Sequence, residues 1–141
     1  MKYLLDTCVI SDFVKGDAGV MSRLRSERPM DLAISAITVM EIHYGLVLHP
    51  DRAKQLEPII SSLIRMIEVI PYENNEAIAT AKIRASLKQQ DLPIDPYDVM
   101  IAGTAMSKQL TMVTSNSGEF EKVGSLLVED WRLNPKILLW Q

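Results

Sequence analysis

Short apolar runs alternate with longer helical patterns along nearly the whole of this chain. The runs expected to form strands lie at residues 1–5, 32–35, 68–71, 110–114 and 126–128. Parallel strands need a crossover between them, and that crossover is usually a helix. The alternation therefore predicts an α/β fold, with a five-stranded parallel sheet flanked by helices on both faces.

The segments between these runs have apolar residues at the spacing of one helix face. Helices are expected at residues 36–48, 51–66, 75–90 and 97–109, and at residues 11–28 with a break around Gly16 and Gly19. The 97–109 segment is apolar nearly all round, which predicts a buried central helix. The expected N-terminal caps are Ser11, Asp51, Asn75 and, before Pro96, Asp95. The apolar tail, residues 134–141, is expected to dock against the rest of the chain.

Length, charge and cysteine content limit the class of protein. The 141 residues are expected to form one domain, residues 1–141. A net charge of −3 gives no basic envelope, so binding of nucleic acid must come from a local patch. Cys8 is the only cysteine, which excludes an internal disulfide, and no apolar run is long enough for a membrane span. Because Asp6 interrupts the first apolar run, no signal peptide is expected and the protein is predicted to be cytoplasmic.

Acidic residues stand where several of the apolar segments begin or end. Asp6 follows the first strand, Glu41 interrupts an apolar helix, and Asp98 opens the central helix. The loop after the fourth strand contains Asn116 and Glu119. A carboxylate in apolar surroundings is costly without a partner, and several together repel one another. A divalent cation relieves that repulsion, and an all-oxygen set favours Mg²⁺ or Mn²⁺ over zinc. The acids therefore predict a metal-dependent enzyme.

Each acid also has a purely structural interpretation. Asp6 is typical of a strand-to-helix turn, and Glu41 of the exposed margin of a helix. Asp98 and Asp95 together form a helix-capping arrangement, and Asp95 is assigned to the cap. The loop after the fourth strand has the composition of a simple turn. The shared position of the acids, at the carboxyl edge of one parallel sheet, favours a functional site.

With these residues in place, the chain resembles a PIN-domain ribonuclease of the VapC toxin type. The matching stretches appear in family order and cover nearly the whole chain. They are residues 4–7, 34–45, 83–87, 93–102, 113–120 and 128–131. Each stretch is weak by itself, whereas the ordered set is specific.

The resemblance implies a PIN-like fold with an acidic pocket that binds Mg²⁺ or Mn²⁺. It implies that Asp6, Glu41 and Asp98 are the catalytic, metal-binding acids of that pocket. The fourth catalytic position is either Asn116 or Glu119. The expected contacts with substrate or partner, hydroxyl ligands included, are Thr7, Arg84, Thr114 and Ser115.

Two positions depart from the family pattern. Cys8 stands where asparagine is usual, which changes any hydrogen bond made by that side chain. Asp95 stands where glycine is usual, and it is expected to add negative charge to the rim of the pocket.

The resemblance further implies a metal-dependent endoribonuclease that acts as the toxin of a toxin–antitoxin pair, with transfer RNA as one substrate class. It implies a homodimer and a cognate antitoxin whose C-terminal segment occupies the pocket. Two basic runs are expected to guide RNA: Arg23, Arg25 and Arg28, and Lys82, Arg84 and Lys88. The alternative is a non-catalytic PIN-like module that binds RNA or a partner. The retained acids argue against it, because a scaffold does not need them.

Overall fold

Five parallel strands form one sheet in the order β3-β2-β1-β4-β5 in the computed structural model, which describes residues 1–133. The strands are β1 (Tyr3–Leu5), β2 (Leu32–Ser35), β3 (Glu68–Ile70), β4 (Thr111–Val113) and β5 (Val128–Glu129). Every pairing between neighbours is parallel, so the predicted five-stranded parallel α/β fold is confirmed. The predicted docking of the tail, residues 134–141, lies outside the described residues.

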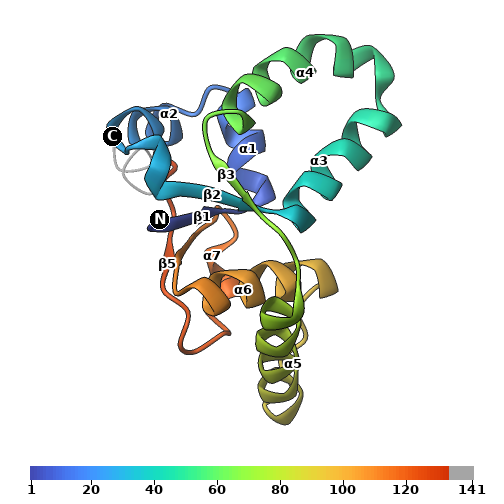
Figure 1. Ribbon diagram of the computed structural model, residues 1–141, viewed down its shortest axis with the longest axis vertical. Helices are drawn as coiled ribbons and strands as arrows, with labels where there is room; N and C mark the ends of the chain where they lie inside the picture. The colour runs from blue at the N-terminus through green and yellow to red at the C-terminus, as the bar shows by residue number, and fades with distance from the viewer. Residues whose placement is uncertain (134–141) are drawn as a thin grey trace, which may run out of the picture.

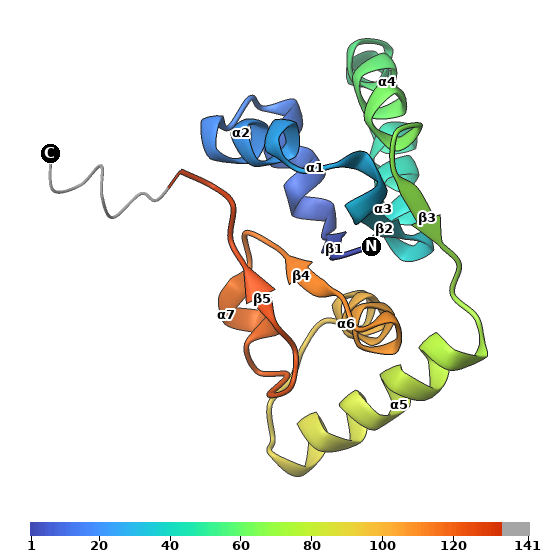
Figure 2. The same cartoon turned by 60° about the vertical axis from the view of Figure 1, so that its left-hand side comes forward.

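Helices connect the strands and cover both faces of the sheet (Figure 1). They are α1 (Thr7–Val14), α2 (Ala18–Ser26), α3 (Ala36–Leu48), α4 (Pro50–Ile64), α5 (Asn74–Gln89), α6 (Pro96–Lys108) and α7 (Ser117–Phe120), with a 3₁₀ turn at Pro29–Asp31. Figure 2 shows α5 and α6 on the opposite side of the sheet from α4. Within residues 1–133, no helix has the length and apolar character needed to cross a membrane.

Successive strand residues point to opposite faces of the sheet and so enter two separate cores. Leu4 of β1 lies in the core formed with α5 and α6, together with Ile83 and Ile101. Leu5 lies in the core formed with α1 to α4, together with Val9. Leu4 and Leu5 are both fully buried, as expected for a central strand of a parallel sheet. This double burial explains why the strands appear in the sequence as continuous apolar runs.

The first helix begins earlier than predicted. It starts at Thr7, directly after β1, rather than at Ser11. Asp6 is its N-cap: the backbone there is extended, and the side chain accepts a hydrogen bond from the Thr7 N–H. The helix starts where the chain leaves the strand because a capping carboxylate already stands there. Asp6 is therefore a strand-to-helix residue, and this role places its carboxylate at the sheet edge.

Two other predicted caps are displaced. The N-cap of α4 is His49, and Asp51 lies in the first turn of that helix. α5 is capped by Glu73 through a reciprocal capping box, rather than by Asn75. Asp95 is the N-cap of α6, as predicted. Neighbouring polar residues compete for a cap, so the sequence identifies the region of a helix start more reliably than the residue.

α5 and α6 cross at close range. A Cβ on Gly103 would collide with the side chain of Thr80, so the crossing requires glycine. Beside it, the Glu76 side chain is only 3% exposed, accepts a hydrogen bond from Ser107 Oγ at 2.9 Å, and lies 3.7 Å from Lys108 Nζ. Burial by itself would raise the pKa of Glu76. The hydrogen bonds from the α5 N-cap N–H and from Ser107, with the charge of Lys108, outweigh burial and hold that pKa below its usual value.

Candidate active site

The carboxyl edge of the sheet brings together residues from opposite ends of the chain. Asp6 follows β1 and Thr114 follows β4, and these strands are neighbours in the sheet. Asp6 Oδ1 accepts a hydrogen bond from the Thr7 N–H at 2.8 Å, and Oδ2 accepts one from the Thr114 hydroxyl at 2.9 Å. Asp6 is 4% exposed, so these donors fix a buried carboxylate. Ligands of parallel α/β sheets bind at this edge.

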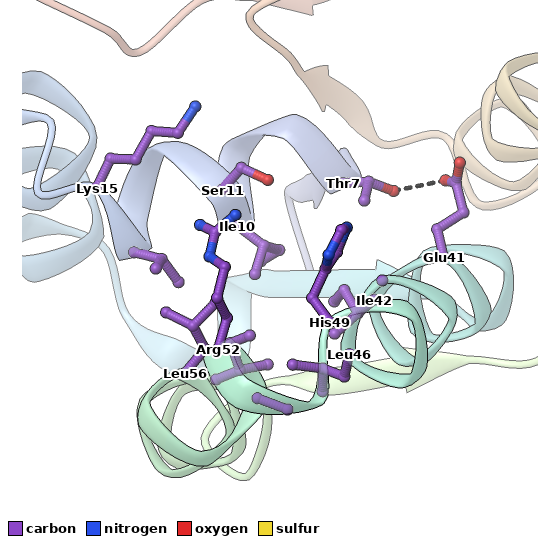
Figure 3. Close-up of a pocket in the computed structure, with 14 residues that line it drawn as sticks. Thr7, Ile10, Ser11, Lys15, Glu41, Ile42, Leu46, His49, Arg52 and Leu56 are labelled. Atoms are coloured by element: carbon purple, nitrogen blue, oxygen red, sulfur yellow. Dashed lines mark hydrogen bonds between the residues drawn. The ribbon is translucent and has the colours of Figure 1, made fainter.

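Glu41 reaches the same edge from α3, which begins as soon as β2 ends. Ser35 caps that helix by accepting a backbone N–H on its hydroxyl. The Thr7 hydroxyl donates to Glu41 Oε1 at 2.6 Å (Figure 3). The same hydroxyl lies 3.3 Å from Thr38 Oγ1. Thr7 therefore joins the start of α1 to α3 and holds Glu41 beside the end of β1.

Asp98 lies in the first turn of α6. Its backbone N–H donates a hydrogen bond to Asp95 Oδ1, with 3.3 Å between the nitrogen and the oxygen. Burial, together with the charges of four neighbouring carboxylates, raises the pKa of Asp98 to about 7; the neighbours are Asp6, Asp95, Glu41 and Glu119. Burial also raises the pKa of Glu41, against the lowering effect of its hydrogen bond to a hydroxyl, and the charges of Asp6 and Asp95 add to the rise. These acids therefore share one electrostatic field.

Cys8 lies inside this group. Its Sγ lies 3.2 Å from Asp6 Oδ2 and 3.4 Å from Thr114 Oγ1, and it accepts a hydrogen bond from the Ser115 N–H at 3.3 Å. Burial raises the pKa of the Cys8 thiol, and the charge of Asp6 raises it further. The thiol therefore stays protonated and donates a hydrogen bond to Asp6 Oδ2. The departure from asparagine at this position still provides a hydrogen bond to the buried acid.

The two residues predicted for the fourth position have different surroundings. Asn116 is exposed, and its N–H donates to Thr114 Oγ1 at 2.9 Å while its side chain makes no capping bond to α7. Glu119 forms an ion pair with Lys122 at 3.0 Å and adds to the field around Asp98. The choice between Asn116 and Glu119 stays a prediction.

Three of the four predicted contact residues lie at the sheet edge. Thr7, Thr114 and Ser115 all belong to the hydrogen-bond network around Asp6. Arg84 is exposed on α5 and lines a separate hollow of about 650 Å³ formed by α5 and the start of α6. None of the predicted acids lines that hollow, so the role of Arg84 in RNA contact stays a prediction.

The donors at this edge suit a hard divalent cation in their chemistry, because nearly all of them are oxygens. Within residues 1–133, however, no three His, Cys, Asp or Glu side chains stand together as a ready-made ligand set. Asp6 bonds to Thr114, and Glu41 bonds to Thr7. Binding of a cation would require these side chains to turn toward one another.

Comparison with known proteins identifies the family. The PIN domain model matches residues 3–126. The chain is 35% identical over 131 residues to the tRNA(fMet)-specific endonuclease VapC of Shigella flexneri, covering 93% of this chain and 98% of that protein. It is also 35% identical over 133 residues to the protein of the same name from Salmonella typhimurium, with the same coverage. Ribonuclease VapC2 of Haemophilus influenzae is 29% identical over 132 residues, again with 93% and 98% coverage.

Solved structures agree with the sequence relatives. A chain of the DNA-bound VapBC from Salmonella typhimurium matches with a TM-score of 0.84 and 36% identity, over 93% of this chain and 98% of that chain. FitAcB from Neisseria gonorrhoeae matches with a TM-score of 0.80 and 29% identity, over 95% of this chain and 98% of that chain. All five predicted catalytic residues lie within the matched region. The chain therefore belongs to the PIN-domain family, among the VapC-type ribonucleases.

Proposed function

We propose that this protein is the ribonuclease toxin of a toxin–antitoxin pair and that it cleaves RNA at the edge formed by Asp6, Glu41 and Asp98. The observation that supports this most is the convergence of three acids from β1, α3 and α6 without a cationic partner. Within residues 1–133, none of the three forms an ion pair with Lys, Arg or His. Acids that only maintain a fold are normally paired, so this group is suited to binding a cation and substrate.

Asp6, Glu41 and Asp98 would hold Mg²⁺ or Mn²⁺ after turning inward. When bound, the cation supplies positive charge against the phosphodiester and lowers the pKa of a water molecule. The chain's own residues orient the acids. The Thr114 hydroxyl and the Thr7 N–H hold the two oxygens of Asp6, and the Thr7 hydroxyl holds Glu41. The acids also exclude unassisted binding of RNA, because their charge repels phosphate.

Metal removal tests this proposal. EDTA should stop RNA cleavage, and Mn²⁺ or Mg²⁺ should restore it. The cation should also raise the melting temperature, by a stabilisation of about 2.7 kcal/mol when its concentration is 100 times its Kd. That shift should vanish in the triple variant Asp6→Asn/Glu41→Gln/Asp98→Asn. A shift that persists there would mean that the cation binds elsewhere. RNA binding without any cleavage would support the alternative, a non-catalytic PIN-like module.

The names of two relatives support a choice of substrate. Two of them are named as tRNA(fMet)-specific endonucleases, and we propose initiator transfer RNA as the substrate of this chain. Sequencing of RNA 5′ ends after induction without the antitoxin should show one dominant cut in that transfer RNA. Cuts distributed over messenger RNA would contradict this choice while leaving the ribonuclease assignment intact.

The solved structures support a protein partner. The solved relatives are VapBC and FitAcB complexes, and we propose that this chain acts in the cytoplasm as a homodimer controlled by a cognate antitoxin. Exposed apolar side chains on α3 support a protein partner at this side: Met40, Tyr44, Val47 and Leu48. The antitoxin would place an arginine among Asp6, Glu41 and Asp98, because a guanidinium pairs with several carboxylates.

Competition tests the arginine. Mg²⁺ should weaken the antitoxin complex, and truncation of the arginine should cost about 2–5 kcal/mol of binding. An antitoxin affinity that is indifferent both to Mg²⁺ and to Asp6→Asn would mean that inhibition works by covering the RNA groove instead. Light scattering of the isolated toxin would test the homodimer.

A further inference from the structure

The first basic run expected to guide RNA is largely occupied by structural ion pairs. Arg23 pairs with Glu27 at 3.2 Å and with Glu129 at 3.4 Å. Arg28 pairs with Asp31 at 3.1 Å. In the second run, on α5, Arg84 and Lys88 line the hollow that none of the predicted acids lines, and Lys82 lines another. A protein with a net charge of −3 therefore needs other cations to hold RNA beside its acids.

Two cations lie on a pocket that is continuous with the acid site. Lys15 and Arg52 are exposed, and within residues 1–133 neither forms an ion pair. Both line a cavity of about 230 Å³ between α1, α3 and α4. Thr7 and Glu41 line the same cavity, and Figure 3 shows their hydrogen bond at the end away from Lys15. The pocket therefore extends from a predicted catalytic acid to two free cations.

The floor of this pocket is apolar. It is lined by the side chains of Ile10, Val14, Leu46, Leu56 and Ile60. The cavity is smaller than the usual small-molecule site of about 300–1,000 Å³, and a single nucleobase is a ligand of suitable size for it. An apolar floor with cations at one end matches the two parts of a nucleotide, its base and its phosphate.

We propose that this pocket is a nucleotide subsite, in which Lys15 and Arg52 bind a phosphate of the RNA strand and the apolar floor receives a base. The proposal rests on the ribonuclease function proposed above. Lys15 follows Thr7 by eight residues, which is about 12 Å along a helix. Stacked nucleotides advance by about 3.4 Å each. The bound phosphate therefore lies within roughly four nucleotides of the cleaved bond.

The test uses Lys15→Gln, Arg52→Gln and the double variant Lys15→Gln/Arg52→Gln. Each is compared with the single control variant Lys54→Gln. Lys54 is a matched control, because it is an exposed cation of α4 that lines a different hollow. With an initiator transfer RNA transcript and Mn²⁺, the double variant should raise KM about tenfold and leave kcat within about twofold. The dependence of log KM on log salt should fall by about 0.7 for each lost phosphate contact. Arg52→Lys should restore part of the affinity, and Lys54→Gln should match wild type.

Each result has a distinct meaning. Unchanged KM and salt dependence in the double variant would overturn the subsite. An unchanged KM together with a weaker antitoxin complex would show that the pocket binds a peptide, which also overturns it. A wild-type protein that cleaves no RNA would overturn the proposed function and this inference together. Because both side chains are exposed, thermal melting should show that the variants remain folded.

Discussion

The α5–α6 crossing and the carboxyl edge of the sheet both bury carboxylates, and they differ in what surrounds the charge. At the α5–α6 crossing, Glu76 has a hydrogen-bond donor in Ser107 and a cation in Lys108, and its pKa lies below the usual value although burial opposes this. At the sheet edge, Asp98 is surrounded by other acids, and burial with their charges raises its pKa to about 7. The first carboxylate stabilises the fold in its charged form, and the second destabilises it.

The comparison shows that burial alone does not mark a functional acid. Glu76 is more buried than Glu41 or Asp98, yet its partners satisfy it within the structure. Acids without partners repel one another in the folded protein. A bound cation or guanidinium removes that repulsion and so stabilises the fold. The two regions should therefore respond in opposite ways to substitution, and each prediction below tests that contrast.

The largest expected effect is on catalysis. Asp6→Asn and Asp98→Asn each keep the shape of the side chain but remove an anionic ligand, so each should lower RNA cleavage by about 10³-fold or more, with the fold retained. The matched control is Glu76→Gln, which changes a buried acid remote from the sheet edge and should keep the wild-type rate per folded molecule. Initial rates at saturating Mg²⁺ measure this. Near-wild-type cleavage by both aspartate variants would remove the catalytic assignment.

The loss of stability should show the reverse order to the loss of cleavage, with the larger effect at Glu76. Glu76→Ala leaves the Ser107 hydroxyl and the Lys108 charge without their partner, so the free energy of unfolding should fall by about 2–4 kcal/mol. Urea denaturation measures the loss. Glu121→Ala is the control, because Glu121 is exposed and outside this junction, and it should change stability by no more than about 0.5 kcal/mol. Equal effects of the two substitutions would mean that Glu76 is not a structural acid.

The pH dependence of stability should separate the regions without any metal. Asp98 has a higher pKa in the fold, about 7, than its ordinary value of 3.8, so protonation stabilises the fold. That stabilisation is complete below about pH 4 and is lost as the pH rises through 7. In EDTA at pH 8, Asp98→Asn should be more stable than wild type by about 1–2 kcal/mol, after allowance for solvent screening. The difference should disappear near pH 4, and parallel pH profiles would contradict it.

The smallest expected effect concerns Cys8. Cys8→Ala removes one hydrogen bond to Asp6 and leaves the Ser115 N–H without its acceptor. The transition state should lose about 1 kcal/mol of stabilisation, so kcat/KM at limiting Mn²⁺ should fall about fivefold. Saturating Mn²⁺ should reduce the difference in activity between the variant and wild type, because a bound cation also orients Asp6. Cys8→Ser and Cys8→Asn should recover most of the activity. Loss that is independent of metal concentration would indicate a packing defect instead.

Much of the sheet edge could be predicted from sequence, because strand ends are local signals. Asp6 directly follows one apolar run and Thr114 ends another, and parallel strands bring such ends together. The position of Cys8 could not be predicted in this way. Its contacts to Thr114 and Ser115 span more than 100 residues and depend on side-chain orientation. Only the folded register of β1 against β4 brings them within hydrogen-bond distance.

The structural acid was missed for a related reason. Glu76 stands in a polar segment at the start of α5, which has the composition of an exposed helix end. It becomes buried only because α6 approaches closely enough at Gly103 to cover it. Helix caps were misplaced at Ser11 and Asn75 because several polar residues near each helix start could serve, and the tertiary path of the chain decides between them.

The position of β1 between β2 and β4 also determines when the acid site can form during synthesis of the chain. Tyr3 pairs with Leu32 on one side and with Thr111 on the other. The Asp6–Thr114 hydrogen bond closes a separation of 108 residues. A growing chain emerges from the ribosome N-terminus first, and distant contacts form late. The acid site therefore cannot assemble on a nascent chain until β4 has been translated, so a nuclease built in this way stays inactive until its synthesis is almost finished.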